Sequence, residues 1–109
     1  METNQYIKVL KTKTRRPVNV AMRGAVISLL KSHNIPIKII AECLGYTKRH
    51  CYAQYYQTRD LMESGDKIVK SAFAELEQHS IKVQPYVING DDIFSQHGGY
   101  KLIIDNVIY

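Results

Sequence analysis

The chain has 109 residues, which is enough for one domain with a modest apolar core. No apolar run approaches the ~18 residues that a membrane span needs, and residues 1–5 lack the basic and apolar regions of a signal peptide. Residues 1–59 carry eleven Lys and Arg against two Glu, whereas residues 60–109 carry four against eight acidic residues. We therefore expect a cytoplasmic protein with no membrane contact, whose basic N-terminal half suits nucleic acid.

Two elements are expected before the most informative part of the chain. Residues 6–10 are short and apolar-alternating, which indicates a strand or part of an ordered arm. A basic stretch without acidic residues follows, made of Lys11, Lys13, Arg15 and Arg16. Proline is favourable at a first helical position, so a helix is expected from Pro17 or Val18 to about His33.

A helix-turn-helix pattern occupies residues 40–55. Gly45 can take the positive φ that ends a helix. Thr47 is the expected N-cap of the second helix, because its hydroxyl can accept from a free backbone N–H. We expect the two helices at about 37–44 and 47–62. The alternative is a plain corner between two helices that serves packing alone.

The second helix of such a motif normally presents its N-terminal end to base edges in the major groove. Arg and Lys can pair there with guanine and Gln with adenine. Basic residues outside the motif would contact phosphates, or enter the minor groove as basic arms do. The predicted DNA-binding residues are Lys13, Arg15, Arg16, Arg23, Thr47, Lys48, Arg49, His50 and Gln54. The alternative for the basic residues is an exposed helix surface and a basic loop without a defined target.

The second helix also carries apolar and aromatic residues at helical spacing, namely Cys51, Tyr52, Tyr55, Tyr56 and Met62. We expect this run to pack in the core and along the helix flank, with a base-stacking surface as the alternative. Cys43 and Cys51 lack the paired spacing of a zinc site, even with His50. They are therefore expected to be free core residues, and no metal or cofactor is predicted.

The C-terminal third changes from helix to strand. A helix capped by Asp66 is expected, with an apolar stripe made of Ile68, Val69, Ala72, Phe73 and Leu76. Strands are expected at 83–88 and 100–109, with turns at Asn89-Gly90 and Gly98-Gly99. An isolated hairpin is marginal in water, so this one must pack on the helices, pair with residues 6–10 or meet another chain.

These elements predict a mainly α fold in a single domain, 1–109. Four helices would form a helix-turn-helix core over residues 12–79, and residues 80–109 would form a small β-hairpin appendix.

Several stretches of the predicted core share their spacing with a known family. They are Thr14-Arg15-Arg16 with Val18 to Arg23, then Leu29-Leu30, Ile37, Ile40, Ala41, Leu44 and Gly45, and finally Thr58 to Glu63 with Phe73 and Leu76. Through them, residues 12–78 resemble the C-terminal DNA-binding domain of the bacterial replication initiator DnaA, whose helix-turn-helix is of the Trp-repressor-like type.

The resemblance breaks at the start of the recognition helix. The family has a Gly-Gly-Arg-Asp-His-Thr-Thr signature there, and residues 45–51 retain only Gly45 and, shifted by one position, His50. The resemblance therefore implies the same binding mode with a different target sequence. The chain shows no sign of the family's ATPase domain, so initiation activity is not implied.

The sequence thus predicts binding of double-stranded DNA in replication or transcription control. No enzymatic activity is expected, because no nucleophile–base grouping or phosphate-binding loop is present. The alternative is an interaction or dimerisation module, in which the helix-turn-helix is structural and residues 83–109 contact a second copy or a partner protein. An apolar strand edge would support it, made of Leu102, Ile103, Ile104, Val107 and Ile108.

Overall fold

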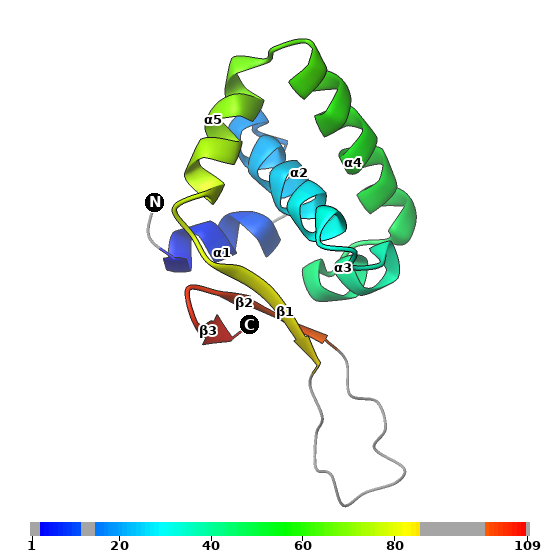
Figure 1. The fold of residues 1–109 in the computed structure, drawn as a ribbon, viewed down its shortest axis with the longest axis vertical. Helices are drawn as coiled ribbons and strands as arrows, with labels where there is room; N and C mark the ends of the chain where they lie inside the picture. The colour runs from blue at the N-terminus through cyan, green and yellow to red at the C-terminus, as the bar shows by residue number, and fades with distance from the viewer. Residues whose placement is uncertain (1–2, 12–14, 86–99, 109) are drawn as a thin grey trace, which may run out of the picture.

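The computed structural model describes residues 3–11, 15–85 and 100–108. They form five helices and a three-stranded antiparallel sheet (Figure 1). The helices are α1 (Thr3–Lys11), α2 (Pro17–Ser32), α3 (Ile37–Leu44), α4 (Lys48–Glu63) and α5 (Lys67–Leu76). The strands are β1 (Ile81–Pro85), β2 (Tyr100–Ile104) and β3 (Val107–Ile108). The mainly helical fold with a small sheet is confirmed, with one more helix than expected.

The additional helix is α1, so the predicted strand or arm at residues 6–10 is wrong. Tyr6 and Leu10 lie one helical turn apart and are both fully buried, and Ile7 is buried beside them. Val9, which alternation would group with Ile7, is only half-buried. The buried residues therefore follow the helical period, which a five-residue window cannot separate from alternation.

α2 is the central helix and lies between α4 and α5 (Figure 1). It begins at Pro17, as predicted, and every residue from Ala21 to Ile27 is buried. Gly24 allows α4 to approach closely, because a Cβ at this position would lie 2.0 Å from Oγ1 of Thr58. A helix enclosed in this way offers little of its middle to solvent.

The predicted helix ends are confirmed at three positions. Gly45 closes α3 with a φ of 75°, which glycine adopts without steric cost. The Thr47 hydroxyl accepts from the backbone N–H of His50 at 3.1 Å and caps α4. Asp66 caps α5 by accepting from the backbone N–H of Val69 at 3.0 Å. The boundaries of both motif helices therefore agree with the sequence to within a residue or two.

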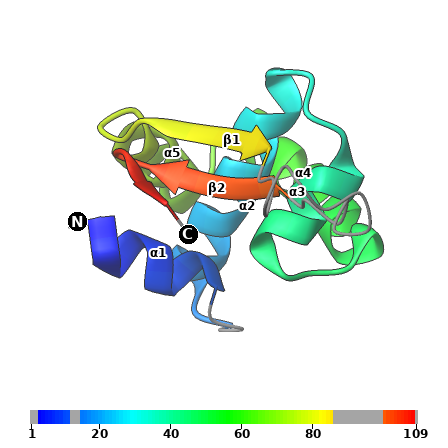
Figure 2. The same ribbon diagram turned by 90° about the horizontal axis from the view of Figure 1, so that it is seen from below.

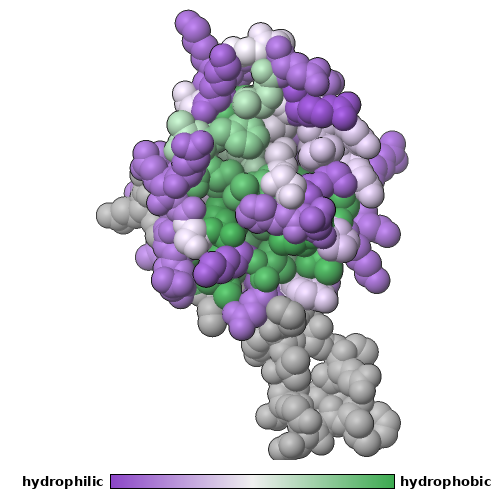
Figure 3. Space-filling model, viewed as in Figure 1, coloured by the Kyte–Doolittle hydropathy of each residue, from purple (hydrophilic) through white to green (hydrophobic). Residues whose placement is uncertain are grey.

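The sheet packs on the helices rather than standing apart. β1 pairs with β2, with Ile81 opposite Ile104, and both residues are buried together with Leu102. Viewed from below, the sheet lies across the ends of the helices, beside α1 (Figure 2). The buried apolar residues of helices and sheet belong to one cluster. On the face seen in Figure 3, hydrophobic residues lie between the helices and hydrophilic residues border them.

The predicted strand over residues 100–109 is instead a tight hairpin. Asp105 and Asn106 have φ values of 50° and 67°, and they connect Ile104 to its partner Val107. Short polar side chains tolerate this left-handed conformation, which matches the twist of paired strands. The predicted turns at Asn89-Gly90 and Gly98-Gly99 lie outside the described residues.

A polar cluster connects α1, the end of α5 and the β2–β3 turn. His79 Nδ1 lies 2.6 Å from Oδ2 of Asp105, and its ring centroid lies 4.6 Å from that of Tyr6. The Tyr6 hydroxyl is buried and has no hydrogen-bond partner among the described residues. Burial, and after it the nearby Glu75 carboxylate, raises the pKa of Tyr6 well above its ordinary value. The neutral hydroxyl is therefore the form that the fold favours.

We expect Tyr6→Phe to raise the free energy of unfolding by about 1 kcal/mol at pH 7, because it removes an unsatisfied buried hydroxyl. A second effect follows at alkaline pH. Unfolded tyrosine loses its proton near pH ~10, whereas folded Tyr6 retains it, so the native state binds more protons and stability falls as pH rises above that value. Urea unfolding at pH 7 and at higher pH should show a smaller alkaline loss for this variant than for the control Tyr56→Phe. Equal alkaline losses of stability in the two variants would contradict the assignment of this loss to Tyr6.

Candidate nucleic-acid interface

The α3–α4 turn presents the start of α4 to solvent. Beyond Gly45, the backbone N–H of Tyr46 donates to the carbonyl of Ala41 at 3.0 Å, which completes a Schellman-type end for α3. The Thr47 cap then starts α4 at Lys48, and the side chains of Lys48 and Arg49 are both exposed. The predicted recognition helix therefore begins with two solvent-facing cations.

Tyr46 holds His50 in a defined position. The two rings stack with centroids 4.8 Å apart and planes within 18° of each other. The Arg23 guanidinium lies over the same tyrosine ring, 4.9 Å from its centroid. The Tyr46 hydroxyl donates to the Leu10 carbonyl of α1 at 3.4 Å. These contacts connect the first turn of α4 to α2 and α1, so the His50 side chain is positioned by the core.

A groove of about 410 Å³ lies where the start of α2, the middle of α4 and the start of α5 meet. Its polar lining residues are Arg15, Arg23, His50, Gln54, Gln57 and Thr58, and its apolar ones are Pro17, Val20, Ala21, Leu61, Ile68 and Val69. Among the described residues that line it, none is Asp or Glu. The structure thus gathers four of the predicted residues, Arg15, Arg23, His50 and Gln54, around one concave surface.

Gln57 belongs to this groove and was not predicted. It lies one turn beyond Gln54 and two turns beyond His50, on the same side of α4. The sequence contained a signal that could have identified Gln57. Residues 50, 54 and 57 are spaced by four and three positions, and this spacing places three polar side chains along one helix flank.

Arg23 is not the exposed phosphate contact that the sequence predicted. Only 3% of its surface is accessible, and its guanidinium lies against Tyr46. The reason is its place on α2, whose middle is enclosed by α4 and α5. Arg23 lines the inner part of the groove instead, where its positive charge contributes to the potential of the site.

The remaining predicted residues lie at the surface or outside the described residues. Arg15, Arg16 and Thr47 are exposed, as are Lys48 and Arg49. Lys13 lies in the segment that the structure does not describe.

The aromatic run of α4 is divided between core and surface. Cys51 is fully buried and Tyr55 is half-buried against the core. Tyr52, Tyr56 and Met62 are 43%, 47% and 38% exposed, so these three lie along the helix flank and not in the core. Helical spacing identified their helix correctly, but it could not reveal which flank α2 covers.

Both cysteines are free and buried, as predicted. Burial raises the pKa of the Cys51 thiol, although the nearby Arg23 charge partly lowers it. The Cys43 thiol donates to the carbonyl of Tyr100 at 3.5 Å and so connects α3 to β2. In the described part of the chain, no three His, Cys, Asp or Glu side chains gather in a way that could hold a metal ion.

None of the helices within the described ranges is both long and apolar enough to span a membrane. Comparisons with protein-family models, curated proteins and solved structures gave no match for this chain.

Proposed function

We propose that this chain binds double-stranded DNA, with the N-terminal half of α4 in the major groove. Arg15 and Arg16 contact phosphates or enter the adjacent minor groove. One observation carries the proposal, namely that Arg15 lines the same groove as His50 and Gln54 of the recognition helix. Arg15, which precedes α2, and the polar flank of α4 therefore belong to one surface, so a single duplex can contact both.

The charge of this surface supports a polyanionic partner. The first half of α4 contains Lys48 and Arg49, and no acidic residue occurs on the helix before Asp60. Arg15 lines the groove opposite α4, and both Arg15 and the adjacent Arg16 are exposed. Phosphates supply most of the affinity of such interfaces, and base contacts supply the specificity.

The side chains of α4 also fit base recognition. Arg49 can form the bidentate pair with guanine O6 and N7, and Gln54 and Gln57 can pair with adenine N6 and N7. His50 is already held by Tyr46, which reduces the side-chain entropy that binding would otherwise remove.

The resemblance to the DnaA DNA-binding domain supports the same mode of docking and a role in replication or transcription control. Its signature is absent from residues 45–51, so we propose a different target sequence. The interaction-module alternative has less support, because Leu102 and Ile104 are 2% and 0% exposed in the chain's own core. Among the apolar strand residues named for it, Val107 is exposed.

Selection from randomised duplexes tests this proposal. We expect the purified chain to enrich a defined sequence, and Arg49→Ala to weaken binding to it by about 1–3 kcal/mol while relaxing preference at one base pair. Lys82→Ala removes the same charge from the solvent side of β1 and should leave the preference intact. If the chain enriches no sequence, or if both variants behave alike, base reading by α4 is wrong.

A further inference from the structure

A second surface of α4 lies on the flank opposite the groove. At about 100° per residue, positions 50, 54 and 57 share one side of the helix, and positions 48, 52, 55 and 59 share the other. This second flank, with the adjacent Tyr56 and with Lys31 of α2, forms an aromatic–basic strip, whose members are Lys31, Lys48, Tyr52, Tyr55, Tyr56 and Arg59. α4 runs along one edge of the molecule, where no other described element covers its outer face (Figure 1).

The tyrosines of the strip are ordered with respect to one another. The ring planes of Tyr52 and Tyr56 are within 16° of parallel, with centroids 6.4 Å apart. Tyr55 meets Tyr56 edge-on, with centroids 5.3 Å apart. Tyr52 and Tyr56 are both nearly half exposed. The helix thus presents two parallel aromatic rings to solvent one turn apart.

Each exposed ring has a cation beside it. Nζ of Lys31 lies 5.9 Å from the ring centroid of Tyr52 and 5.3 Å from that of Tyr55. Cζ of Arg59 lies 5.1 Å from the ring centroid of Tyr56. The strip contains no Asp or Glu, and it ends where Asp60 and Glu63 begin.

We propose that the aromatic–basic strip binds unpaired bases of single-stranded DNA. Bases stack on aromatic side chains whatever their identity, and Lys or Arg beside the rings neutralise the phosphates that connect them. The strip supplies both components along one helix flank, with positive charge at both ends and aromatic rings between. Protein–protein interfaces also rely on Tyr and Arg. The centre of such an interface is depleted of charged residues. In the strip, by contrast, a cation lies beside every tyrosine ring.

This assignment goes beyond duplex binding, because the two surfaces share α4 but use different flanks. Lys48 and the first turns of α4 belong to both surfaces, so one molecule would bind a duplex and an unpaired strand in turn rather than together.

The test uses the full chain and two labelled probes of roughly ten nucleotides, an oligodeoxythymidine and an abasic strand of the same length. We expect oligodeoxythymidine to bind more tightly, with Tyr52→Ala and Tyr56→Ala each weakening it roughly tenfold. Tyr52→Phe keeps the ring and should retain most of the affinity. Both tyrosines are exposed, so circular dichroism of the alanine variants should match that of the parent chain.

Duplex binding separates this inference from the proposed function. The alanine variants should bind a duplex as the parent chain does, and Arg15→Ala should weaken duplex binding more than it weakens oligodeoxythymidine binding.

Equal affinity of the chain for the abasic strand and for oligodeoxythymidine would overturn base stacking. Equal loss of duplex binding in the tyrosine variants would assign the strip to the duplex interface and overturn the inference. Self-association that the same substitutions abolish, without single-strand binding, would show a protein contact instead. Single-strand binding that persists without duplex binding would refute the proposed function alone.

Discussion

Replacing Gly24 with alanine is expected to lower the free energy of unfolding by about 1–2 kcal/mol. In an open helix this substitution would stabilise, because alanine has the better helix propensity by roughly 1 kcal/mol. Here the new Cβ would lie 2.0 Å from Oγ1 and 3.3 Å from Cβ of Thr58. Both atoms are close to the α4 backbone, so α2 and α4 must separate, and overpacking of this kind typically costs about 1–3 kcal/mol. The steric effect therefore outweighs the gain in propensity.

Urea unfolding measures this effect, and two variants control it. Ser71→Ala changes an exposed position of α5 and should have little effect. Combining Gly24→Ala with Thr58→Ala removes the clashing oxygen, so the double variant should be more stable than Gly24→Ala alone. If Gly24→Ala is as stable as the parent chain, α2 and α4 are not packed as closely as the structure shows.

Replacing Arg15 and Arg16 together with alanine is expected to weaken duplex binding roughly 10- to 100-fold at low salt. Each exposed guanidinium can form a charge-assisted hydrogen bond with a phosphate, worth about 1.5–3 kcal/mol before solvent screening reduces it. Losing two phosphate contacts should also lower the magnitude of the salt slope by about 2. The loss should be similar for every duplex sequence, unless one of the arginines reads minor-groove width.

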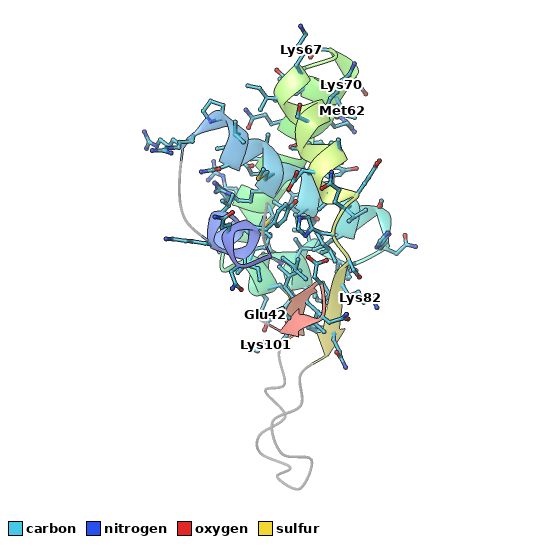
Figure 4. The ribbon with its side chains drawn as sticks, turned by 90° about the vertical axis from the view of Figure 1, so that its left-hand side faces the viewer. Glu42, Met62, Lys67, Lys70, Lys82 and Lys101 are labelled. Carbon is cyan, nitrogen blue, oxygen red and sulfur yellow. The ribbon has the colours of Figure 1, made fainter. Side chains whose placement is uncertain are left out.

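A matched control for this double variant is Lys70→Ala with Lys82→Ala, which removes the same charge. Lys70 lies on α5 and Lys82 on β1, at opposite ends of the molecule (Figure 4). Anisotropy titrations at two salt concentrations should show a large loss for the arginine pair and a small one for the lysine pair. Similar losses of duplex affinity for both pairs would mean that the net charge of the chain, rather than the position of Arg15 and Arg16, determines affinity.

The sequence predicted those parts of the fold that depend on local chemistry. Pro17, Gly45, Thr47 and Asp66 each set a helix boundary through φ or through one capping hydrogen bond, and the structure shows all four in those roles. The position of α4 and its exposed Lys48 and Arg49 followed directly from these boundaries.

The errors came from tertiary packing, which periodicity does not contain. Arg23 was expected to contact phosphates, but α2 is enclosed by its neighbours and Arg23 is buried. Tyr52 and Tyr56 were expected to pack in the core and along the helix flank, but they are largely exposed, because α2 covers the side of α4 that carries Cys51 and Thr58. The turn at Asp105-Asn106 lacks glycine, so it was less visible in the sequence than Asn89-Gly90.

The salt dependence of duplex binding tests the central claim most directly. If α4 and the arm engage roughly six phosphates, log K should fall with log[salt] at a slope of about −5. The binding constant of the full chain for a duplex, measured across a series of salt concentrations, gives this slope. A slope near −5 agrees with docking of the basic arm and α4 on the backbone, and a slope near zero would contradict DNA binding by this surface.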